Sequence, residues 1–485
     1  MIQLSADIAV IAGGPAGLSA AVQAAEDGAS VILVEKAATC GGAANMGMGP
    51  LGIGTHHQKR QMLDVSLEKC LRLFMEYTHY MVDARLVRRY FALSADTIEW
   101  LEEKGVEFEG AFRYFAKSEP TWHIVKTDRG IGARAASFMI RRLYERALEL
   151  GVDVRLETKA TKILKENGAV TGVRATGKDG EELEIRSRAV IVATGGAGAN
   201  PDMIREETGL SWGEDLFNTQ VPGLMGEGLR MAWEAGAART KVRIEGAATV
   251  GNGDIANVSH SVHNVFQQPN LLVNLQGKRF MDENDMQNTT FLHNAVSRQK
   301  HAIAFSIIDT RIARYYIKNG VDAVSFVRND PDVSDFIDSL ENAIAQGSRS
   351  FFKADTLEEL AEKTGIDREN LLATVEDYNA YCESWDEEFF KDRSLMRPID
   401  KAPFYCAVIR PSGYGTVGGI RINENCEALD GEFEPVPGLY AAGADACNLY
   451  DDSYMFLLPG NSMGFAVNSG RIAGMSAAEY AASGK

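Results

Sequence analysis

Two short hydrophobic runs enclose an alanine-rich stretch within the first forty residues of the chain. The runs are IAVI at residues 8–11 and VILV at residues 31–34, and runs of this kind are typical of strands buried on both faces of a parallel sheet. Residues 18–25 are rich in alanine, whose small side chain lets a helix pack closely on a sheet. The pattern predicts a strand–helix–strand unit of a Rossmann-like sheet.

The periodicity changes several times further along the chain. Residues 60–105 and 134–150 have apolar positions at helical spacing. Residues 152–194 consist of short alternating runs with turn signals, which predicts a small antiparallel layer. Residues 240–398 are mixed and polar, and we expect them to form a separate cap domain. A last helix is expected from about Asn461.

The turn after the first strand approximates the glycine-rich frame of dinucleotide-binding proteins. Ala12 replaces the first glycine of this frame, and Gly14 and Gly17 hold the other two positions. Glu35 ends the second strand, where its carboxylate can accept hydrogen bonds from ribose hydroxyls, and a helix N-terminus suits a pyrophosphate. We therefore expect a dinucleotide here, and a negative φ at Ala12, because alanine is strained at a positive φ.

Further glycine-rich segments favour FAD as the dinucleotide. They lie at residues 40–49, 193–198, 438–445 and 459–464. The first has too many glycines for a packed helix and suits a backbone that lies along an extended ligand. The last begins a helix whose N-terminal dipole would face the N1–C2=O end of a flavin and stabilise its reduced form.

At these residues the sequence resembles the FAD-dependent fumarate reductase and succinate dehydrogenase flavoprotein superfamily. It is similar to the 3-ketosteroid dehydrogenase and ene-reductase type more than to true fumarate reductases. The resemblance covers nearly the whole chain and includes Gly226–Gly228, Leu272–Asn274 and Gly277–Phe280. It implies an α/β fold in which a Rossmann-like FAD-binding domain, with a small antiparallel layer, carries an inserted α+β cap that closes over the flavin.

The same resemblance implies domain boundaries and cofactor contacts. The FAD-binding domain would comprise residues 1–239 and 399–485, with the cap at 240–398 between them. The residues expected to bind FAD are Gly14, Ala16, Gly17, Glu35, Lys36, Gly41, Gly42, Ala43, Ala44, Met48, Gly49, Ala160, Ala193, Thr194, Gly195, Glu227, Gly443, Asp445, Asn461 and Ser462. Attachment is expected to be non-covalent, because His56-His57 match poorly the histidine that some family members link to FAD.

The dicarboxylate site of fumarate reductases is absent from this sequence. The resemblance implies two arginines and two histidines there. Gln287 and Leu457 occupy the positions of the arginines. Gly415 occupies the position of one histidine, and the other would fall near Ala248, where no histidine occurs. Without those cations two substrate charges would be buried unpaired, which is strongly unfavourable. We therefore do not expect fumarate or succinate as the substrate.

The candidate catalytic residues are Tyr414, Gly418 and Tyr454. Tyr414 and Gly418 have the spacing with which ketosteroid dehydrogenases hold a ketone oxygen by a tyrosine hydroxyl and a backbone N–H. A tyrosine also serves as acid or base if its pKa is lowered; Tyr414 is the first candidate, and Tyr454 and Tyr450 are the second. The alternative for each is a packed tyrosine whose hydroxyl is satisfied.

The expected reaction is hydride transfer between flavin N5 and a carbon β to a carbonyl. The favoured direction is reduction of an activated C=C bond in an enone-like or enoate-like substrate, steroid-like molecules included. One alternative is a dehydrogenase or oxidase that introduces a C=C bond next to a ketone. Another is an FAD-binding electron-transfer subunit without a substrate site. Electrons would come from NAD(P)H, reduced flavin or a redox partner protein.

Composition limits the expected partners, redox centres and cellular location of the protein. The net charge of −17 argues against a nucleic-acid partner. The six cysteines lack C-x-x-C spacing, which is typical of a reduced cytoplasmic protein without haem or iron–sulfur clusters. No signal peptide and no membrane span are expected.

Several other polar residues are weaker candidates for roles in the site. No His, Cys and carboxylate cluster has metal-ligand spacing, so no metal is expected. Arg129 and Arg410 are the two arginines that could bind a substrate carboxylate. For both, we favour a side chain that is solvated or that caps a helix. His260, His263 and Trp122-His123 are expected to be solvated or packed rather than catalytic.

Overall fold

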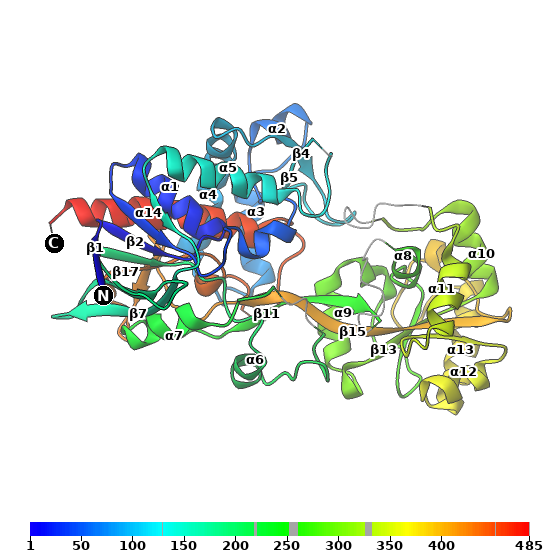
Figure 1. Ribbon diagram of the computed structural model, residues 1–485. Coiled ribbons are helices and arrows are strands. Elements are labelled where there is room, and N and C mark those ends of the chain that lie inside the picture. Colours follow the sequence, from blue (N-terminus) through cyan, green and yellow to red (C-terminus); the bar gives the residue numbers. More distant parts are fainter. Residues whose placement is uncertain (129, 218–220, 252–259, 325–331, 452, 485) are drawn as a thin grey trace.

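The computed structural model describes the chain except residues 129, 218–220, 252–259, 325–331, 452 and 485. It consists of a larger and a smaller lobe (Figure 1). Strand β11 (Arg243–Val250) and the long strand β15 (Phe404–Val417) run side by side from one lobe into the other. Both termini lie in the larger lobe.

The centre of the larger lobe is a six-stranded sheet in the order β16-β17-β10-β2-β3-β6. All neighbours are parallel except β16 and β17. The strands are β2 (Ile8–Ile11), β3 (Val31–Val34), β6 (Asp153–Arg155), β10 (Ala189–Val192), β16 (Glu427–Leu429) and β17 (Pro435–Ala441). Every residue of β2, β3 and β10 is buried, as their uniformly apolar sequences predict.

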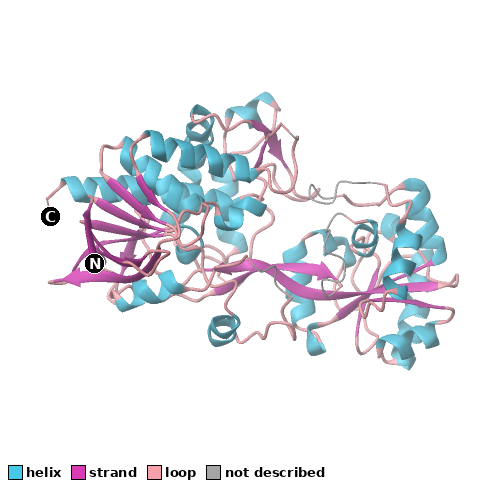
Figure 2. Ribbon diagram, in the orientation of Figure 1, coloured by secondary structure: helices cyan, strands magenta, loops and turns pink. Residues whose placement is uncertain are grey.

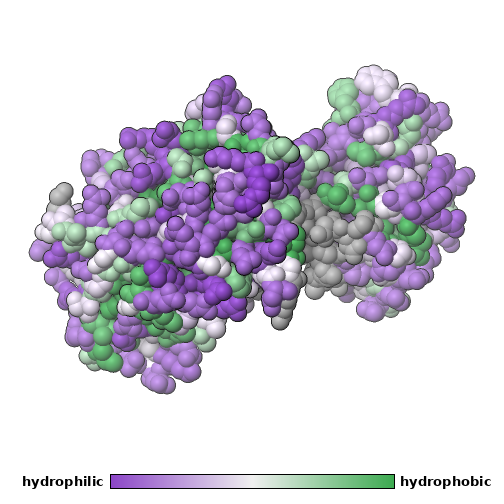
Figure 3. Space-filling model, turned by 90° about the horizontal axis from the view of Figure 1, so that it is seen from above, coloured by the Kyte–Doolittle hydropathy of each residue, from purple (hydrophilic) through white to green (hydrophobic). Residues whose placement is uncertain are grey.

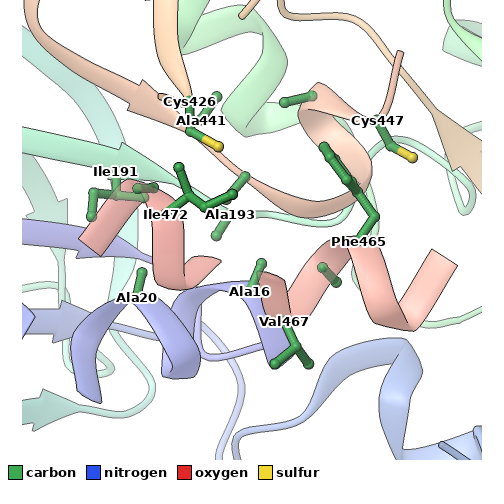
Figure 4. Packing of buried hydrophobic residues seen from close by; sticks show 14 of the residues in the cluster. Ala16, Ala20, Ile191, Ala193, Cys426, Ala441, Cys447, Phe465, Val467 and Ile472 are labelled. Carbon is green, nitrogen blue, oxygen red and sulfur yellow. The ribbon is translucent and has the colours of Figure 1, made fainter. Parts of the chain in front are cut away.

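Helices α1 (Pro15–Glu26) and α14 (Asn461–Ala482) pack closely against each other beside this sheet (Figures 1 and 2). Small residues allow the contact, since a Cβ on Gly470 would lie 2.3 Å from the Ala16 carbonyl oxygen. Figure 4 shows Ala16 and Ala20 beside Val467 and Ile472 in this core. The contact holds the N-termini of the two helices in one lobe.

The other elements of the larger lobe extend this centre. A second sheet has the order β1-β9-β8-β7, formed by β1 (Ile2–Ser5), β7 (Lys159–Glu166), β8 (Ala169–Thr176) and β9 (Glu182–Arg186). Three of its strands are antiparallel as expected, and β1 adds in parallel. The remaining elements are α2 (His56–Arg60), α3 (Leu67–Tyr77), α4 (Ala84–Glu103), β4 (Phe108–Phe112), β5 (Trp122–Val125), α5 (Ala136–Glu149), α6 (Pro201–Thr208) and α7 (Glu227–Glu234).

The smaller lobe has its own sheet and hydrophobic core. Its strands follow the order β11-β15-β13-β12, and β14 also pairs with β15. Its elements are β12 (Leu271–Asn274), β13 (Ala304–Asp309), β14 (Phe351–Ala354), α8 (Ser261–Phe266), α9 (Thr289–Ser297), α10 (Thr310–Asn319), α11 (Phe336–Ala345), α12 (Leu357–Thr364) and α13 (Arg368–Glu383). This core runs from Ala248 to Ile409, past position 398, because the first part of β15 pairs with β13 and β14.

The predicted α/β class with a cap is confirmed, and the domain boundaries stay a prediction. The surface seen from above is mostly hydrophilic, with scattered hydrophobic residues (Figure 3). Within the described residues, no helix combines the length and apolarity that crossing a membrane requires.

Candidate active site

The first glycine turn forms an open, backbone-lined cradle at the start of α1. Gly14 caps this helix, and no side chain among the described residues binds its first N–H groups. A Cβ on Gly14 would meet nothing within 4 Å, and one on Gly42 would meet only the Gly14 Cα, at 3.9 Å. Free N–H groups beside open space suit a diphosphate, so these residues fit the centre of FAD.

The expected negative φ at Ala12 is wrong, since φ is +82° there. The turn requires this conformation because Gly17 packs on the Ala12 carbonyl, where a Cβ on Gly17 would lie 1.9 Å from the oxygen. The Ala12 N–H also donates to the carbonyl of Val34 at 2.8 Å. Tertiary packing therefore holds an alanine in a conformation that favours glycine.

Glu35 and its neighbours connect the turn to the rest of the lobe. The buried Glu35 carboxylate accepts backbone hydrogen bonds from Gly13 and Ala37, both at 2.7 Å. A carboxylate has further lone pairs, which remain for a ribose. Lys36 forms an ion pair with Glu227 at 2.8 Å. Burial opposes ionisation of Glu227, but its bonds to Lys36 and Lys159 outweigh burial and lower its pKa.

Asp445 organises the glycine-rich loop after β10. Its fully buried carboxylate accepts hydrogen bonds from the Thr194 N–H and hydroxyl and from the N–H of Gly195 and Gly196. Burial raises its pKa, while these hydrogen bonds act in the opposite direction. Asp445 therefore shapes the backbone that is expected to follow the cofactor.

The remaining expected cofactor residues lie on the segments that surround α1 and α14. The Gly41 N–H donates to the Gly13 carbonyl at 2.9 Å, which brings two glycine segments together. A Cβ on Gly443 would lie 2.9 Å from the Ala16 Cβ. The others are Ala43 and Ala44 in a 3₁₀ helix at 42–46, Met48 and Gly49 after it, Ala160 on β7, Ala193 after β10, and Asn461 and Ser462 at the start of α14. The buried Asn461 Nδ2 has no hydrogen-bond partner among the described residues, so it is available to a flavin carbonyl.

Glu245 on β11 meets the start of α14, and sequence reasoning missed it. The Ser462 hydroxyl donates to its carboxylate at 3.2 Å, and the Ser462 N–H donates to the Tyr454 hydroxyl at 3.2 Å. Burial raises the pKa of Glu245 to about 7, against hydrogen bonds from Ser462 and Tyr454 that lower it. The one signal in the sequence is a lone carboxyl at the start of the otherwise uncharged run IEGAATV.

A β-bulge places Glu245 opposite Tyr414. Ile244 pairs with Thr416 and Gly246 with Gly413, so the single residue Glu245 faces both Tyr414 and Gly415. Bulges of this kind reorient side chains beside active sites. The structure thus sets the backbone of an acidic residue opposite that of the first catalytic candidate, on the two strands that connect the lobes.

The tyrosine candidates join an aromatic group at this point. Tyr414 is 42% exposed, and its ring centroid lies 6.5 Å from that of Phe456, which in turn lies 4.9 Å from that of Tyr454. Tyr114 stacks on Phe456 at 4.8 Å, and Tyr450 contacts Tyr454 at 4.7 Å. Burial raises the pKa of Tyr454 well above its usual range, so its hydroxyl stays protonated and lacks the lowered pKa that a role as acid or base requires.

The expected role of Gly418 is wrong. Its N–H donates to the Ala444 carbonyl at 2.9 Å and is not available to a ketone oxygen. The chain turns at the end of β15 to run beside residues 443–446, and φ at Gly418 is +88°. A Cβ there would lie 2.4 Å from the Lys241 carbonyl oxygen, so the glycine serves packing.

Neutral side chains occupy the positions where the family carries cations. The Gln287 amide donates to the Gln267 carbonyl at 2.9 Å, and Ala248 pairs with Pro411 inside the sheet. Arg410 donates to the His301 carbonyl at 2.8 Å, which gives it a structural partner. Arg129 lies outside the described residues.

His56, His57 and Glu102 form a group of possible metal ligands that sequence spacing did not indicate, and the absence of a metal stays a prediction. Their ligand atoms lie within 4.8 Å of one another, although α2 and α4 are distant in sequence. Glu102 accepts from His57 Nε2 at 2.8 Å, and this hydrogen bond accounts for the cluster without an ion. Both ring nitrogens of the buried His123 are hydrogen-bonded, to Thr55 and to Thr121, which confirms its packing role.

Comparisons with known proteins agree with a flavin site. A family model described as FAD binding domain matches residues 7–463. Vinyl phenol reductase of Lactiplantibacillus plantarum is 34% identical over 98% of this chain and 97% of its own length. Urocanate reductase of Eggerthella lenta is 28% identical over 91% of this chain and 70% of its own length. An open flavocytochrome c3 fumarate reductase aligns with a TM-score of 0.72 and 26% identity, over 99% of this chain and 79% of its own.

Proposed function

The chain belongs to the FAD binding domain family, and on this premise we propose that it reduces a conjugated C=C bond in a neutral or singly charged, aromatic or enone-like substrate. It is an FAD-dependent oxidoreductase that acts on CH–CH groups.

The observation that carries the proposal is the presence of neutral residues at four positions where the fumarate reductase pattern has cations. Ala248, Gln287, Gly415 and Leu457 stand where the fumarate reductase pattern has histidines and arginines. A buried carboxylate without a partner costs several kcal/mol, about the effect of a thousandfold or larger change in binding. Two such charges would exclude a dicarboxylate, whereas a neutral alkene incurs no such cost.

The aromatic group around Tyr414 suits a flat, conjugated substrate. Tyr414 and Phe456 offer ring faces and edges, and the Tyr414 hydroxyl can donate to a substrate oxygen on which negative charge builds up. The relative with 34% identity is named for a vinyl phenol, which is a neutral conjugated alkene. When bound, FAD would supply the hydride from N5, and the N-terminus of α14, whose cap residue Gly460 carries no side chain, would stabilise negative charge on its pyrimidine ring.

A substrate panel tests this function. Holoprotein with chemically reduced flavin is mixed anaerobically with a vinyl phenol, an enone, urocanate and fumarate, and products are identified by mass spectrometry. We expect a product that is two hydrogen atoms heavier from the vinyl phenol or the enone, and none from fumarate. Product from fumarate alone would refute the substrate class. Reduction of oxidised flavin by saturated ketones, without any alkene turnover, would favour the dehydrogenase, and flavin that reacts with no substrate would favour the electron-transfer subunit.

A further inference from the structure

We propose that Glu245 is the proton donor to the substrate carbon that does not receive the hydride. The inference rests on the proposed alkene reduction and names a residue in the place of the arginine that Gln287 has replaced. It follows from where β11 places this carboxyl relative to Tyr414 and to the start of α14.

Three contacts fix the position of the carboxyl. The bulge between Ile244 and Gly246 sets Glu245 opposite Tyr414 on the neighbouring strand. Its carboxylate accepts from the Ser462 hydroxyl at 3.2 Å, at the helix start that fits the flavin. The Tyr454 hydroxyl forms a second side-chain hydrogen bond with this carboxyl. The backbone of Glu245 thus pairs beside Tyr414, which is expected to hold the substrate oxygen, and its carboxyl reaches the helix start expected to hold the flavin.

The surroundings of Glu245 keep its proton in place. Within the described part of the chain, the titratable groups that interact with it are Tyr454, Tyr450 and Cys447 from the segment before α14, and His293 of α9 lies against the neighbouring Gly246. Burial lowers the pKa of His293, whose Nδ1 faces the Ala247 carbonyl at 3.1 Å, so this ring is neutral at pH 7. Among the described residues, no cation forms an ion pair with Glu245.

Gln287 and Tyr454 are poorer proton donors to carbon than a carboxyl. The Gln287 amide has no acidic proton and is held by the Gln267 carbonyl. The Tyr454 hydroxyl has a pKa well above its usual range, which makes it a weak acid. A carboxyl whose pKa is about 7 has the strength that efficient acid catalysis at neutral pH requires.

The step balances with the reduced flavin as the source of both electrons. One alkene carbon accepts a hydride, the π-electron pair moves to the other carbon, and that carbon takes the proton from the Glu245 carboxyl. The product is the saturated compound, and FAD is left oxidised. Glu245 is left as a carboxylate, which takes up a proton from solvent before the next turnover.

Glu245→Gln tests the role, because glutamine keeps the size and hydrogen-bonding shape but carries no acidic proton. We expect alkene reduction to fall by roughly 10²–10⁴-fold, the usual contribution of a general acid. Flavin content and reoxidation by ferricyanide, which needs no proton on carbon, should match wild type. The control is Glu427→Gln, which removes a half-buried carboxyl bonded to the Asn423 amide at 2.7 Å, and it should reduce alkenes normally.

An infrared pH titration of the holoprotein supplies a readout apart from turnover. Wild type should show a protonated carboxyl band that disappears with a midpoint near pH 7 and is missing from Glu245→Gln. Retained alkene reduction in Glu245→Gln, or the absence of such a band in wild type, would overturn the proposal. If wild type itself reduces no conjugated alkene, the proposed function fails instead.

Discussion

Replacing Glu245 by glutamine removes a carboxyl whose pKa is raised to about 7 by burial. Burial raises its pKa from 4.5 to about 7, so the folded chain keeps a proton that the unfolded chain has already released. The free energy of unfolding is therefore highest at and below about pH 4.5 and falls as the pH rises towards 7. The rise of the pKa from 4.5 to about 7, at roughly 1.4 kcal/mol for each pH unit, gives a total fall of about 3.5 kcal/mol, of which about 3 kcal/mol lies between pH 4.5 and pH 8.

Urea titrations at about pH 4.5 and about pH 8 measure this effect. Relative to wild type, Glu245→Gln should gain about 3 kcal/mol of stability between the two pH values, because glutamine has no proton to lose. Glu427→Gln serves as the matched change, so the difference between the variants reports Glu245 alone. Equal pH profiles for the two variants would refute the reasoning.

Four other outcomes are expected. Ala12→Gly should raise the free energy of unfolding by about 1 kcal/mol in denaturant titrations, since glycine is unstrained at a φ of +82°. Tyr414→Phe should lose most alkene turnover but keep its FAD, and an unchanged rate would remove Tyr414 from the mechanism. Asp445→Asn should weaken FAD binding at least about tenfold by fluorescence titration, because an amide cannot accept every bond that orders residues 194–196. The rate of alkene reduction should fall as the pH rises through about 7, where Glu245 loses its proton.

The strands and main helices could be predicted because local sequence determines them. The apolar runs at 8–11 and 31–34 can be satisfied only in a buried sheet, and both form neighbouring parallel strands. The sign of φ at Ala12 could not be predicted from residue type. It depends on how closely Gly17 packs on the preceding carbonyl, which is a property of the assembled turn.

Side chains of the candidate site also depend on tertiary contacts that the local sequence does not determine. Tyr414 could be proposed from its spacing, but Glu245 depends on a bulge that pairs it with residues about 170 positions away. The cluster of His56, His57 and Glu102 likewise forms only when α2 meets α4. The hydrogen bond from Gly418 to Ala444 reverses an expectation that spacing alone supported.

Stopped-flow reoxidation of the reduced holoprotein tests the central claim most directly. Flavin absorbance is followed anaerobically after mixing with equal concentrations of a vinyl phenol or of fumarate. Neutral residues at and near Ala248, Gln287, Gly415 and Leu457 predict that the vinyl phenol rapidly restores the oxidised flavin spectrum. They also predict that fumarate restores this spectrum no faster than buffer does, because its two charges would be buried without partners. Rapid reoxidation by fumarate, with none by the vinyl phenol, would contradict the account.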